Sequence, residues 1–459
     1  MNELLTGGNM DLKEKYVAFF KRKNHKILPA ASLIPDNNTT LFTSAGIQQL
    51  VPYMVNEEDH PICSRLTNYQ KCLRLTDIQN IGDSYHHTFF EMLGNWSIND
   101  YFKNEVIEFS YEFLTKELKL DPNRLAVTVF AGDESIARDE ETANKWKELG
   151  IAKERIAYLG YDDNWWPSVN EKGPCGTDTE IFYWRSNEPV PNIFDPNDDN
   201  WVEIWNNVFI QYNRNDEMRL IKLGKKYIDT GMGVERMTSI LEGENDNYRS
   251  SLFRPLIDVI EKHSKKEYDN YKKDMRIIAD HIRAIVMISS ENDKIYPTNK
   301  DRGYVLRRLI RRMIISVHKL DIEKQEDFIV ELVNETVNLL KKDYPYTEND
   351  RVTKLIIDEA KKFQNILLAG QKKVYKAVEV LKNEHLDAMD AKIIFKLYET
   401  HGIPFDLIYS ILDEEKIIYD TEKVNKIYEQ NRVLSRKNAE EKFGNSLSGN
   451  VKTKTLKNN

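Results

Sequence analysis

Residues 85–102 read Tyr-His-His-Thr-Phe-Phe-Glu-Met-Leu-Gly-Asn-Trp-Ser-Ile-Asn-Asp-Tyr-Phe. Aromatic and histidine side chains dominate it, yet Glu91 and Asn95 stand among them. The apolar alternation predicts a strand with Phe90 and Met92 on one face. Buried polar groups need hydrogen-bond partners, so such residues inside an aromatic block indicate a site, with an ordinary core strand as the alternative.

A helix is expected after this strand. Gly94 and Asn95 are expected to end the strand, and Ser97 with Asp100 three residues later resembles a capping box. The apolar side chains beyond it recur at helical spacing, at Phe102, Val106, Phe109 and Phe113. The sequence therefore predicts a strand that enters a helix, with polar side chains at the end of the strand.

The length and composition of the chain indicate a globular protein with a buried core. Its 459 residues suggest two to four domains at ~100–200 residues each, and 41% of the residues are hydrophobic. No run of ~18 apolar residues is present, and residues 1–13 lack the apolar region of a secretory signal. Neither a membrane partner nor secretion is therefore expected.

The cysteines and the net charge limit the chemistry further. Cys63, Cys72 and Cys175 are too scattered for a disulfide framework, which favours a reducing, cytoplasmic location. No cysteine pair has zinc-ligand spacing and none of the nine histidines forms an H-x-x-x-H pair, so no zinc is expected. The net charge of −8 argues against binding nucleic acid through bulk charge, so an RNA partner would need a local basic patch.

Strand-like segments fill most of the first half of the chain. Residues 41–46 predict a short buried strand that runs into 47–53, and residues 71–74 predict a strand that ends in Arg74. A guanidinium there suits a nucleotide site because it can neutralise charge that develops on an α-phosphate, although strand-end arginines are also commonly solvated. Further elements are expected as strands over 125–130 and 203–211 and as a helix over 134–149 that Gly150 stops.

Two glycine pairs are candidates for a close approach of the backbone to a ligand. Gly173 and Gly176 fit a turn. Gly231 and Gly233 let a flat base lie against the backbone, before a helix that carries Arg236. A lone G-x-G is weak evidence for a nucleotide site, but the surrounding Asp-Thr-Gly-Met-Gly-Val-Glu-Arg is more specific.

Helical patterns replace the strands after about residue 243. Residues 277–288 and 302–314 predict helices, and residues 350–383 predict one long helix or a broken pair. A solvated basic face is one interpretation of the 302–314 helix, but in an acidic chain a cluster of arginines without interleaved acids favours contact with phosphates. The arginines that share one arc of this helix are Arg307, Arg308, Arg311 and Arg312.

These motifs, in this order, resemble those of alanyl-tRNA synthetases, a family of class II synthetases. Residues 85–102 are similar to the second signature motif of the family, residues 41–53 to its first and residues 228–236 to its third. Residues 203–211 resemble the strand of its alanine pocket, and residues 395–406 resemble part of its tRNA-recognition domain.

The resemblance implies a fold and an order of domains. A class II antiparallel sheet flanked by helices, which is an α+β fold, is expected over residues 1–243 as the catalytic domain. An all-α tRNA-recognition domain is expected over 244–435, and a polar, disordered tail over 436–459. The editing and C-terminal domains of longer relatives are not expected in this chain.

The resemblance also implies the reaction. Alanine and ATP, with magnesium bound to the triphosphate, would form alanyl-adenylate, and the alanyl group would pass to the 3′ end of the tRNA specific for alanine. One alternative is a tRNA-binding paralogue without catalysis, against which the retained Arg74, Asp229 and Arg236 argue. The other is an enzyme that passes the adenylate to a different acceptor; the arginine helix and residues 395–406 argue against it.

Roles for single residues follow from the same resemblance. Arg74 would bind the α-phosphate and the carboxylate, Arg236 the distal phosphates, and Asp229 the substrate ammonium. Gly231 and Gly233 would lie beside the nucleotide, which Met92 would also border. The pocket for the methyl group would be formed by Met92, Trp166, Asn206 and Val208.

For the tRNA, the resemblance implies that a G·U wobble pair in the acceptor stem is read by Asn299 together with an acidic residue of the 395–406 segment. Here that residue is Glu399, where relatives carry an aspartate, so weaker discrimination is expected. The chain departs from the family at two other places. The loop after Arg74 is shorter than in many relatives, and Thr177-Asp178 replaces a Pro-Cys pair.

Overall fold

The structure is a computed structural model that describes residues 11–35, 40–76, 78, 80–167 and 171–431. The chain forms two compact units, one that extends to Ile356 and one that begins at Ile357. Along the chain, the boundary between the two units falls inside the segment that was predicted as one helical domain. The predicted domain bounds, 1–243 and 244–435, stay a prediction. The expected polar tail, 436–459, lies outside the described residues.

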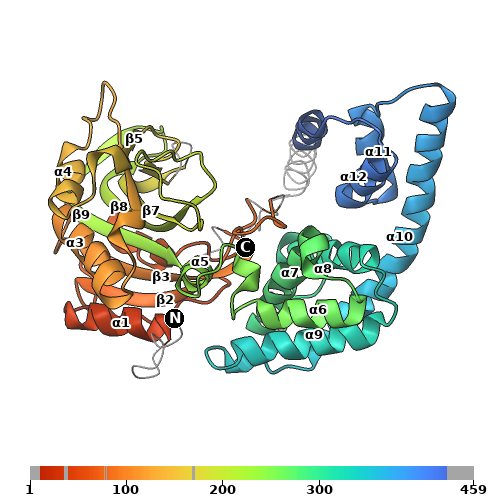
Figure 1. The fold of residues 1–459 in the computed structure, drawn as a ribbon, viewed down its shortest axis with the longest axis horizontal. Coiled ribbons are helices and arrows are strands. Elements are labelled where there is room, and N and C mark those ends of the chain that lie inside the picture. Colours follow the sequence, from red (N-terminus) through yellow and green to blue (C-terminus); the bar gives the residue numbers. More distant parts are fainter. Residues whose placement is uncertain (1–10, 36–39, 77, 79, 168–170, 432–459) are drawn as a thin grey trace, which may run out of the picture. The chain divides into compact units, whose positions relative to one another are not determined.

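A sheet of nine strands forms the centre of the first unit (Figure 1). Its order is β1-β2-β3-β9-β8-β7-β4-β5, with β6 paired to β7. The pairs β1·β2 and β4·β5 are parallel, and the other pairs are antiparallel. The strands are β1 Lys26–Ile27, β2 Arg65–Leu73, β3 Phe89–Ile98, β4 Leu125–Phe130, β5 Ile156–Leu159, β6 Trp165–Trp166, β7 Gly173–Trp184, β8 Trp201–Arg214 and β9 Leu220–Gly233.

Helices lie before and between the strands in the chain, and only helices follow the last strand. This arrangement confirms the predicted α+β class. Those before or between the strands are α1 Leu12–Arg22, α2 Val51–Val55, α3 Lys103–Glu112 and α4 Glu140–Glu148. Those after the last strand are α5 Val234–Leu241, α6 Arg254–Ser264, α7 Lys272–Glu291, α8 Asp301–Lys319, α9 Gln325–Leu340, α10 Arg351–Asn383, α11 Ala391–His401 and α12 Phe405–Glu414. The predicted long helix is therefore the single helix α10. Short 3₁₀ or π turns are η1 Gly46–Gln49, η2 Phe113–Glu117, η3 Pro122–Arg124, η4 Lys153–Arg155, η5 Asn247–Arg249, η6 Tyr268–Asn270 and η7 Pro345–Thr347.

Helices α1 and α3 cover one face of the sheet, and a large cluster of buried side chains lies between them and the strands. Tyr16, Phe19 and Phe20 of α1 are buried as their spacing predicts, and Asp11 caps this helix in a capping box with Glu14. Rings from the helices and from the sheet meet edge-on or tilted in this core: Tyr16 lies 5.2 Å from Phe113 and 5.7 Å from Trp205, measured between ring centroids. With this face filled by aromatic rings, the opposite face of the central strands can carry polar side chains.

The predicted break at Gly94-Asn95 is wrong, because β3 continues through both residues to Ile98. A Cβ atom at Gly94 would lie 2.4 Å from the ring of Trp96, so this glycine makes room for a side chain and does not turn the chain. The predicted capping box is also wrong. Ser97 Oγ accepts a hydrogen bond from the Asp100 amide at 3.3 Å, but α3 begins only at Lys103, where Glu105 accepts from the Phe102 amide.

Three further predictions of local structure were wrong. Residues 41–46 form no strand, and the chain there leads into η1 and α2. The helix expected over 134–149 begins only at Glu140, because the Asp139 side chain caps it by accepting from the Thr142 amide. Gly176 lies within β7 and not in a turn: at this bulge a Cβ atom would lie 1.9 Å from the Phe209 carbonyl oxygen.

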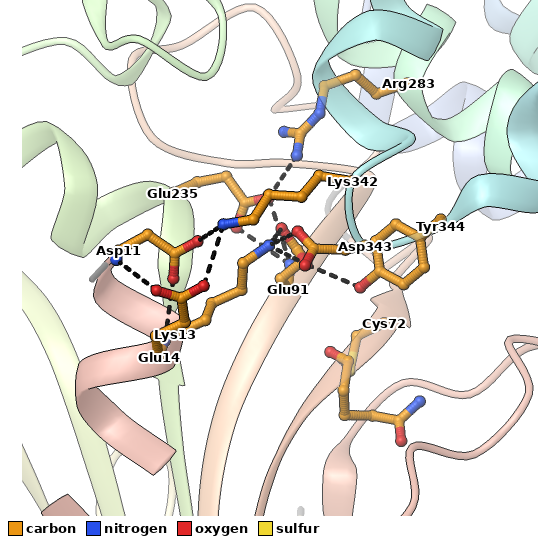
Figure 2. Close-up of polar contacts among 11 residues, drawn as sticks. Asp11, Lys13, Glu14, Cys72, Glu91, Glu235, Arg283, Lys342, Asp343 and Tyr344 are labelled. Atoms are coloured by element: carbon orange, nitrogen blue, oxygen red, sulfur yellow. Dashed lines mark hydrogen bonds and ion pairs between the residues drawn. The ribbon is translucent and has the colours of Figure 1, made fainter. Parts of the chain in front are cut away.

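Buried polar contacts connect α1 and the helices after the last strand to the sheet within the first unit, among them an ion pair of 2.8 Å between Lys71 Nζ of β2 and Glu291 Oε2 of α7. Figure 2 shows Lys13 Nζ donating to Glu91 Oε1 at 3.0 Å, and the hydroxyl of Tyr344, which follows α9, donating to the same oxygen at 2.7 Å. Arg283 of α7 donates to Glu235 Oε1 of α5 at 2.8 Å. These helices therefore reach the strands of the sheet through specific charged contacts.

Candidate active site

Strand alternation gathers the candidate residues on one face of the sheet. Successive side chains of a strand point to opposite faces, so residues two apart share a face, and Cα partners on neighbouring strands do too. The register pairs Val208 with Asp229, Asn206 with Gly231 and Met92 with Gly233. It also pairs Asp178 with Val208 and Glu180 with Asn206. The polar face is thus built from four adjacent strands, β3, β9, β8 and β7.

A cavity of about 380 Å³ opens on this face. It brings together nine residues predicted from the sequence: Arg74, Met92, Trp166, Asn206, Val208, Asp229, Gly231, Gly233 and Arg236. It is also lined by Phe90, which alternation places on the same face as Met92. The remaining lining residues were not singled out by the sequence analysis: Ala45, Tyr85, His86, His87, Glu180, Glu203, Ile204 and Glu235. For Glu180 and Glu203, the available signal was a carboxylate standing within a strongly apolar strand.

Asp229 lies at the floor of this cavity and is 7% exposed. Burial raises the pKa of its carboxyl to about 7, although a hydrogen bond from Trp96 and the charge of Arg74 act in the opposite direction. The Trp96 indole nitrogen donates to Asp229 Oδ1 at 2.7 Å. A carboxylate in such surroundings gains strongly from a cation that enters the cavity.

Two arginines supply positive charge to the cavity from different elements. Arg74, just beyond β2, donates through Nε to the Ser44 carbonyl oxygen at 3.1 Å, and its guanidinium lies 5.1 Å from the centroid of the Phe90 ring. Arg236, in the first turn of α5, donates through Nη1 to the backbone oxygen and to the carboxylate of Glu203, both at 2.9 Å. These contacts hold both guanidinium groups at the cavity, where they can meet an anionic substrate.

A second group of acids lies on β7 and β8. Asp178 is buried, and its Oδ1 accepts from Asn164 Nδ2 at 2.9 Å, while its Oδ2 accepts from Asn206 Nδ2 at 3.5 Å. Burial raises the pKa of Asp178, and burial also raises the pKa of Glu180, with further contributions from Glu203 and Asp178. Asp178 therefore has amide groups as its close partners, whereas Glu203 of β8 is paired with the Arg236 guanidinium.

The two glycines of the third motif differ in what they contribute. A Cβ atom at Gly231 would lie 3.0 Å from Met92 Sδ, so a side chain there would push into the cavity wall. At Gly233 the nearest atom would be Arg236 Cβ at 3.9 Å, which is an ordinary contact. The absence of a side chain is therefore needed for a ligand to approach the backbone closely at Gly231, and much less so at Gly233.

The four arginines predicted to share one surface arc do not all do so. Arg307, Arg308 and Arg311 of α8 are partly exposed, and Arg307 donates to Asn299 Oδ1. Arg312 is 6% exposed and donates to the backbone oxygens of residues 78 and 81, at 3.1 Å in the second case. The surface arc is therefore corrected to three arginines, because the fourth turns inward to hold the 78–81 loop. In the second unit, Glu399 is exposed on α11.

Comparisons with known proteins agree with this geometry. The profile of the family described as tRNA synthetases class II (A) matches residues 11–458. Alanine–tRNA ligase of Borrelia hermsii is 40% identical over 95% of this chain and 74% of its own length, and that of Treponema pallidum is 39% identical over 95% and 73%. Among solved structures, apo histidyl-tRNA synthetase of S. aureus matches 50% of this chain and 63% of its own chain at 14% identity, with a TM-score of 0.32.

The chain therefore belongs to the class II (A) tRNA synthetases. Its relatives within that family are alanine–tRNA ligases, and its function is the ATP-dependent joining of alanine to tRNA. In the part of the chain that the structure describes, no helix has the length and apolar character needed to cross a membrane.

Proposed function

We propose that the cavity on the polar face of the sheet is where alanine and ATP react to form alanyl-adenylate. The proposal is supported above all by one observation: two guanidinium groups and a buried carboxyl from separate motifs line the same cavity. In the first step the carboxylate of alanine attacks the α-phosphate and pyrophosphate leaves. In the second step a ribose hydroxyl at the 3′ end of the tRNA attacks the carbonyl carbon of alanyl-adenylate and loses its proton, so the alanyl ester forms and AMP leaves.

Alanine binds through its ammonium to Asp229, a charge-assisted contact that is stronger than a neutral hydrogen bond. Its methyl group lies among Met92, Trp166, Asn206 and Val208, which are close to Asp229 on the sheet. Because a pocket of this kind distinguishes substrates that differ by one methyl group by only ~1–3 kcal/mol, glycine is also activated to a measurable extent.

ATP lies between the two arginines. Arg74 binds the α-phosphate together with the carboxylate of alanine, Arg236 binds the distal phosphates, and the base lies beside Gly231, Gly233 and Met92. No nucleophilic side chain is needed, because catalysis comes from the orientation of the two substrates and from stabilisation of the charge that develops on the phosphate. The arginines therefore act both in binding and in the transition state.

Magnesium accompanies the triphosphate. It would be held mostly by phosphate oxygens and water, and Glu180 and Glu203 are the carboxyl groups at the cavity that could add an oxygen ligand. When bound, the ion would supply neutralising charge to the phosphates.

For tRNA, we propose that Arg307, Arg308 and Arg311 contact phosphates, while Asn299 and Glu399 take part in reading the G·U pair of the acceptor stem. Arg312 was also predicted to contact tRNA, but its guanidinium is buried and donates to the backbone oxygen of Ile81, so it is not included among the tRNA-binding residues. Glutamate at position 399 is one methylene longer than the aspartate of relatives, so G·U remains preferred but with weaker discrimination.

The test measures two reactions with the same preparation. Alanine-dependent exchange of pyrophosphate into ATP reports the first step, and charging of G·U and G·C minihelices reports the second. Exchange and faster charging of the G·U minihelix are expected. Absence of exchange would favour a tRNA-binding protein without catalysis, exchange without charging would favour a different acceptor, and equal charging of both minihelices would refute the G·U assignment.

A further inference from the structure

Trp96 lies next to Asp229 but does not line the cavity. It is on β3, fully buried, and opposite Asp229 on β9 in the register that pairs Ser97 with Ile228. Its indole N–H donates to Asp229 Oδ1 at 2.7 Å, a short distance that is typical of hydrogen bonds to a charged acceptor. Any effect of Trp96 on a substrate in the cavity must therefore pass through the carboxyl of Asp229.

Two glycines make room for the indole. A Cβ atom at Gly94 would lie 2.4 Å from Trp96 Cζ2, and one at Gly46 would lie 2.6 Å from the same atom. Real Cβ contacts are never this short, so any other residue at either position would displace the ring. The remaining sides of the ring pack in a core cluster that includes Leu66, Ile98 and Val208. The orientation of the indole N–H is therefore set by tight packing and not by the hydrogen bond alone.

We propose that Trp96 is a positioning residue, which holds Oδ1 of Asp229 so that Oδ2 meets the ammonium of the substrate. The inference rests on the proposed role of Asp229 in binding alanine. A free carboxyl can rotate about its last bond, and an oxygen that is held by a packed indole removes this freedom before the substrate arrives. Trp96 itself touches neither alanine nor ATP.

Several other ionisable groups interact with Asp229. Arg74, beyond the end of β2, favours its ionised form. The thiol of Cys72 on β2 and the hydroxyl of Tyr16 on α1 are buried, and Asp229 is among the groups that raise their pKa values. Both therefore stay neutral at physiological pH, which leaves the Trp96 N–H, the Arg74 charge and a hydrogen bond from the backbone of Thr230 as the contacts that favour a carboxylate here.

The test replaces Trp96 by phenylalanine, which keeps a ring but removes the N–H. Exchange of pyrophosphate is measured as a function of alanine concentration between about pH 6 and about pH 9, a range that spans the titration of Asp229. A hydrogen bond to a charged group is lost, so KM for alanine is expected to rise roughly tenfold near neutral pH. The pH profile of this KM should move to higher pH, while KM for ATP and the rate at saturating alanine change little.

Trp205→Phe is the matched control. Trp205 is equally buried, on the opposite face of the sheet, and its indole nitrogen has no hydrogen-bond partner among the residues that the structure describes, so this variant loses the same volume without losing a polar contact. Its KM profile should match that of the wild type. If Trp96→Phe does not fold, Gly46→Ala replaces it, because the added methyl would displace the indole that the chain retains.

Asp229→Asn separates this inference from the proposed function. A large rise in KM for alanine in Asp229→Asn with no change in Trp96→Phe would overturn the positioning role alone. No change in either variant would overturn the role of Asp229 as well. Equal rises in KM for alanine and for ATP in Trp96→Phe would indicate a general structural defect and would also overturn the positioning role.

Discussion

Two sets of buried carboxyl groups in the first unit differ in their partners. Where α7 meets the sheet, burial alone would raise the pKa of Asp280, but hydrogen bonds from His281 and His87 outweigh burial and lower its pKa. Lys71 Nζ, 2.8 Å away, similarly lowers the pKa of Glu291 against the effect of burial. At the cavity, burial prevails over hydrogen bonds from neutral groups, so the pKa values of Asp229 and Asp178 are raised.

The difference separates carboxyl groups that serve the fold from those that serve a ligand. A buried charge is costly unless a partner offsets it, and at α7 the chain itself supplies the partner. Two acids that line the cavity, Glu203 and Glu235, are paired with Arg236 and Arg283. Asp229 and the neighbouring Asp178 instead have the indole of Trp96 and the amides of Asn164 and Asn206 as partners. A substrate ammonium or a metal ion can complete these pairs, which is why perturbed carboxyl groups in a cavity indicate function.

The largest expected effect comes from breaking a pair at the helices. Arg283→Met would leave the buried carboxylate of Glu235 without its cation, and such a loss typically costs ~3–5 kcal/mol of stability. The measurement is the free energy of unfolding in urea, for this single variant and for a double variant. The double variant Arg283→Met/Glu235→Gln should recover part of the loss, because no uncompensated charge remains. A single variant as stable as the wild type would contradict the structural role of this pair.

The next largest effect comes from the cation that the cavity offers to the substrates. Arg74→Ala should lower pyrophosphate exchange by about 10²–10³-fold, because a contact made to charge in the transition state is worth ~3–4 kcal/mol. Its unfolding midpoint should stay close to that of the wild type, since Arg74 is exposed. Exchange within threefold of the wild type would contradict the role of Arg74 in catalysis.

The raised pKa of Asp229 should make the stability of the folded protein depend on pH. Its folded-state pKa of about 7 exceeds the model-peptide value of 3.8, so the folded protein binds more protons between these two values. Stability is therefore lost as the pH rises through that window, by ~1.4 kcal/mol per unit of pKa shift at most. Asp229→Asn should be no more stable than the wild type near pH 4 and more stable near pH 8 in thermal unfolding. Parallel stability curves would show that this carboxyl is not perturbed.

The same ionisation should appear in substrate binding. Only the carboxylate form of Asp229 pairs with an ammonium, so KM for alanine should rise as the pH falls below about 7. The measurement is pyrophosphate exchange at several pH values with ATP saturating. In Asp229→Asn this dependence should disappear, and its persistence would assign the titration to another group.

The smallest expected effect tests two arginines of α8 that the sequence does not distinguish. Arg311→Ala should weaken tRNA binding and reduce its salt dependence by about one unit of slope, with pyrophosphate exchange unchanged. Arg312→Ala should instead lower the unfolding midpoint, because it removes hydrogen bonds to the 78–81 loop. Identical behaviour of the two variants would contradict the division between a surface arginine and an inward one.

The motifs of the chain predicted its family, and strand alternation predicted part of the polar face. Alternation alone placed Phe90 and Met92 on one face of β3, and both line the cavity. The order of the motifs was enough to predict that Arg74, Asp229 and Arg236 belong to one site, and all three line it. These predictions succeed because strand periodicity and motif order are properties of the chain that need no knowledge of distant contacts.

The contact partners of individual side chains became evident only in the folded structure. Gly94 looked like a strand breaker, but it accommodates the Trp96 ring, and Arg312 shares a helical arc with Arg311 yet turns to a loop more than 200 residues earlier in the chain, as its hydrogen bonds with residues 78 and 81 require. Periodicity states which way a side chain points, whereas its partner depends on strands and helices that come together only on folding. For that reason the hydrogen bond from Trp96 to Asp229 could not be predicted from the sequence, although both residues lie in motifs that the sequence makes plain.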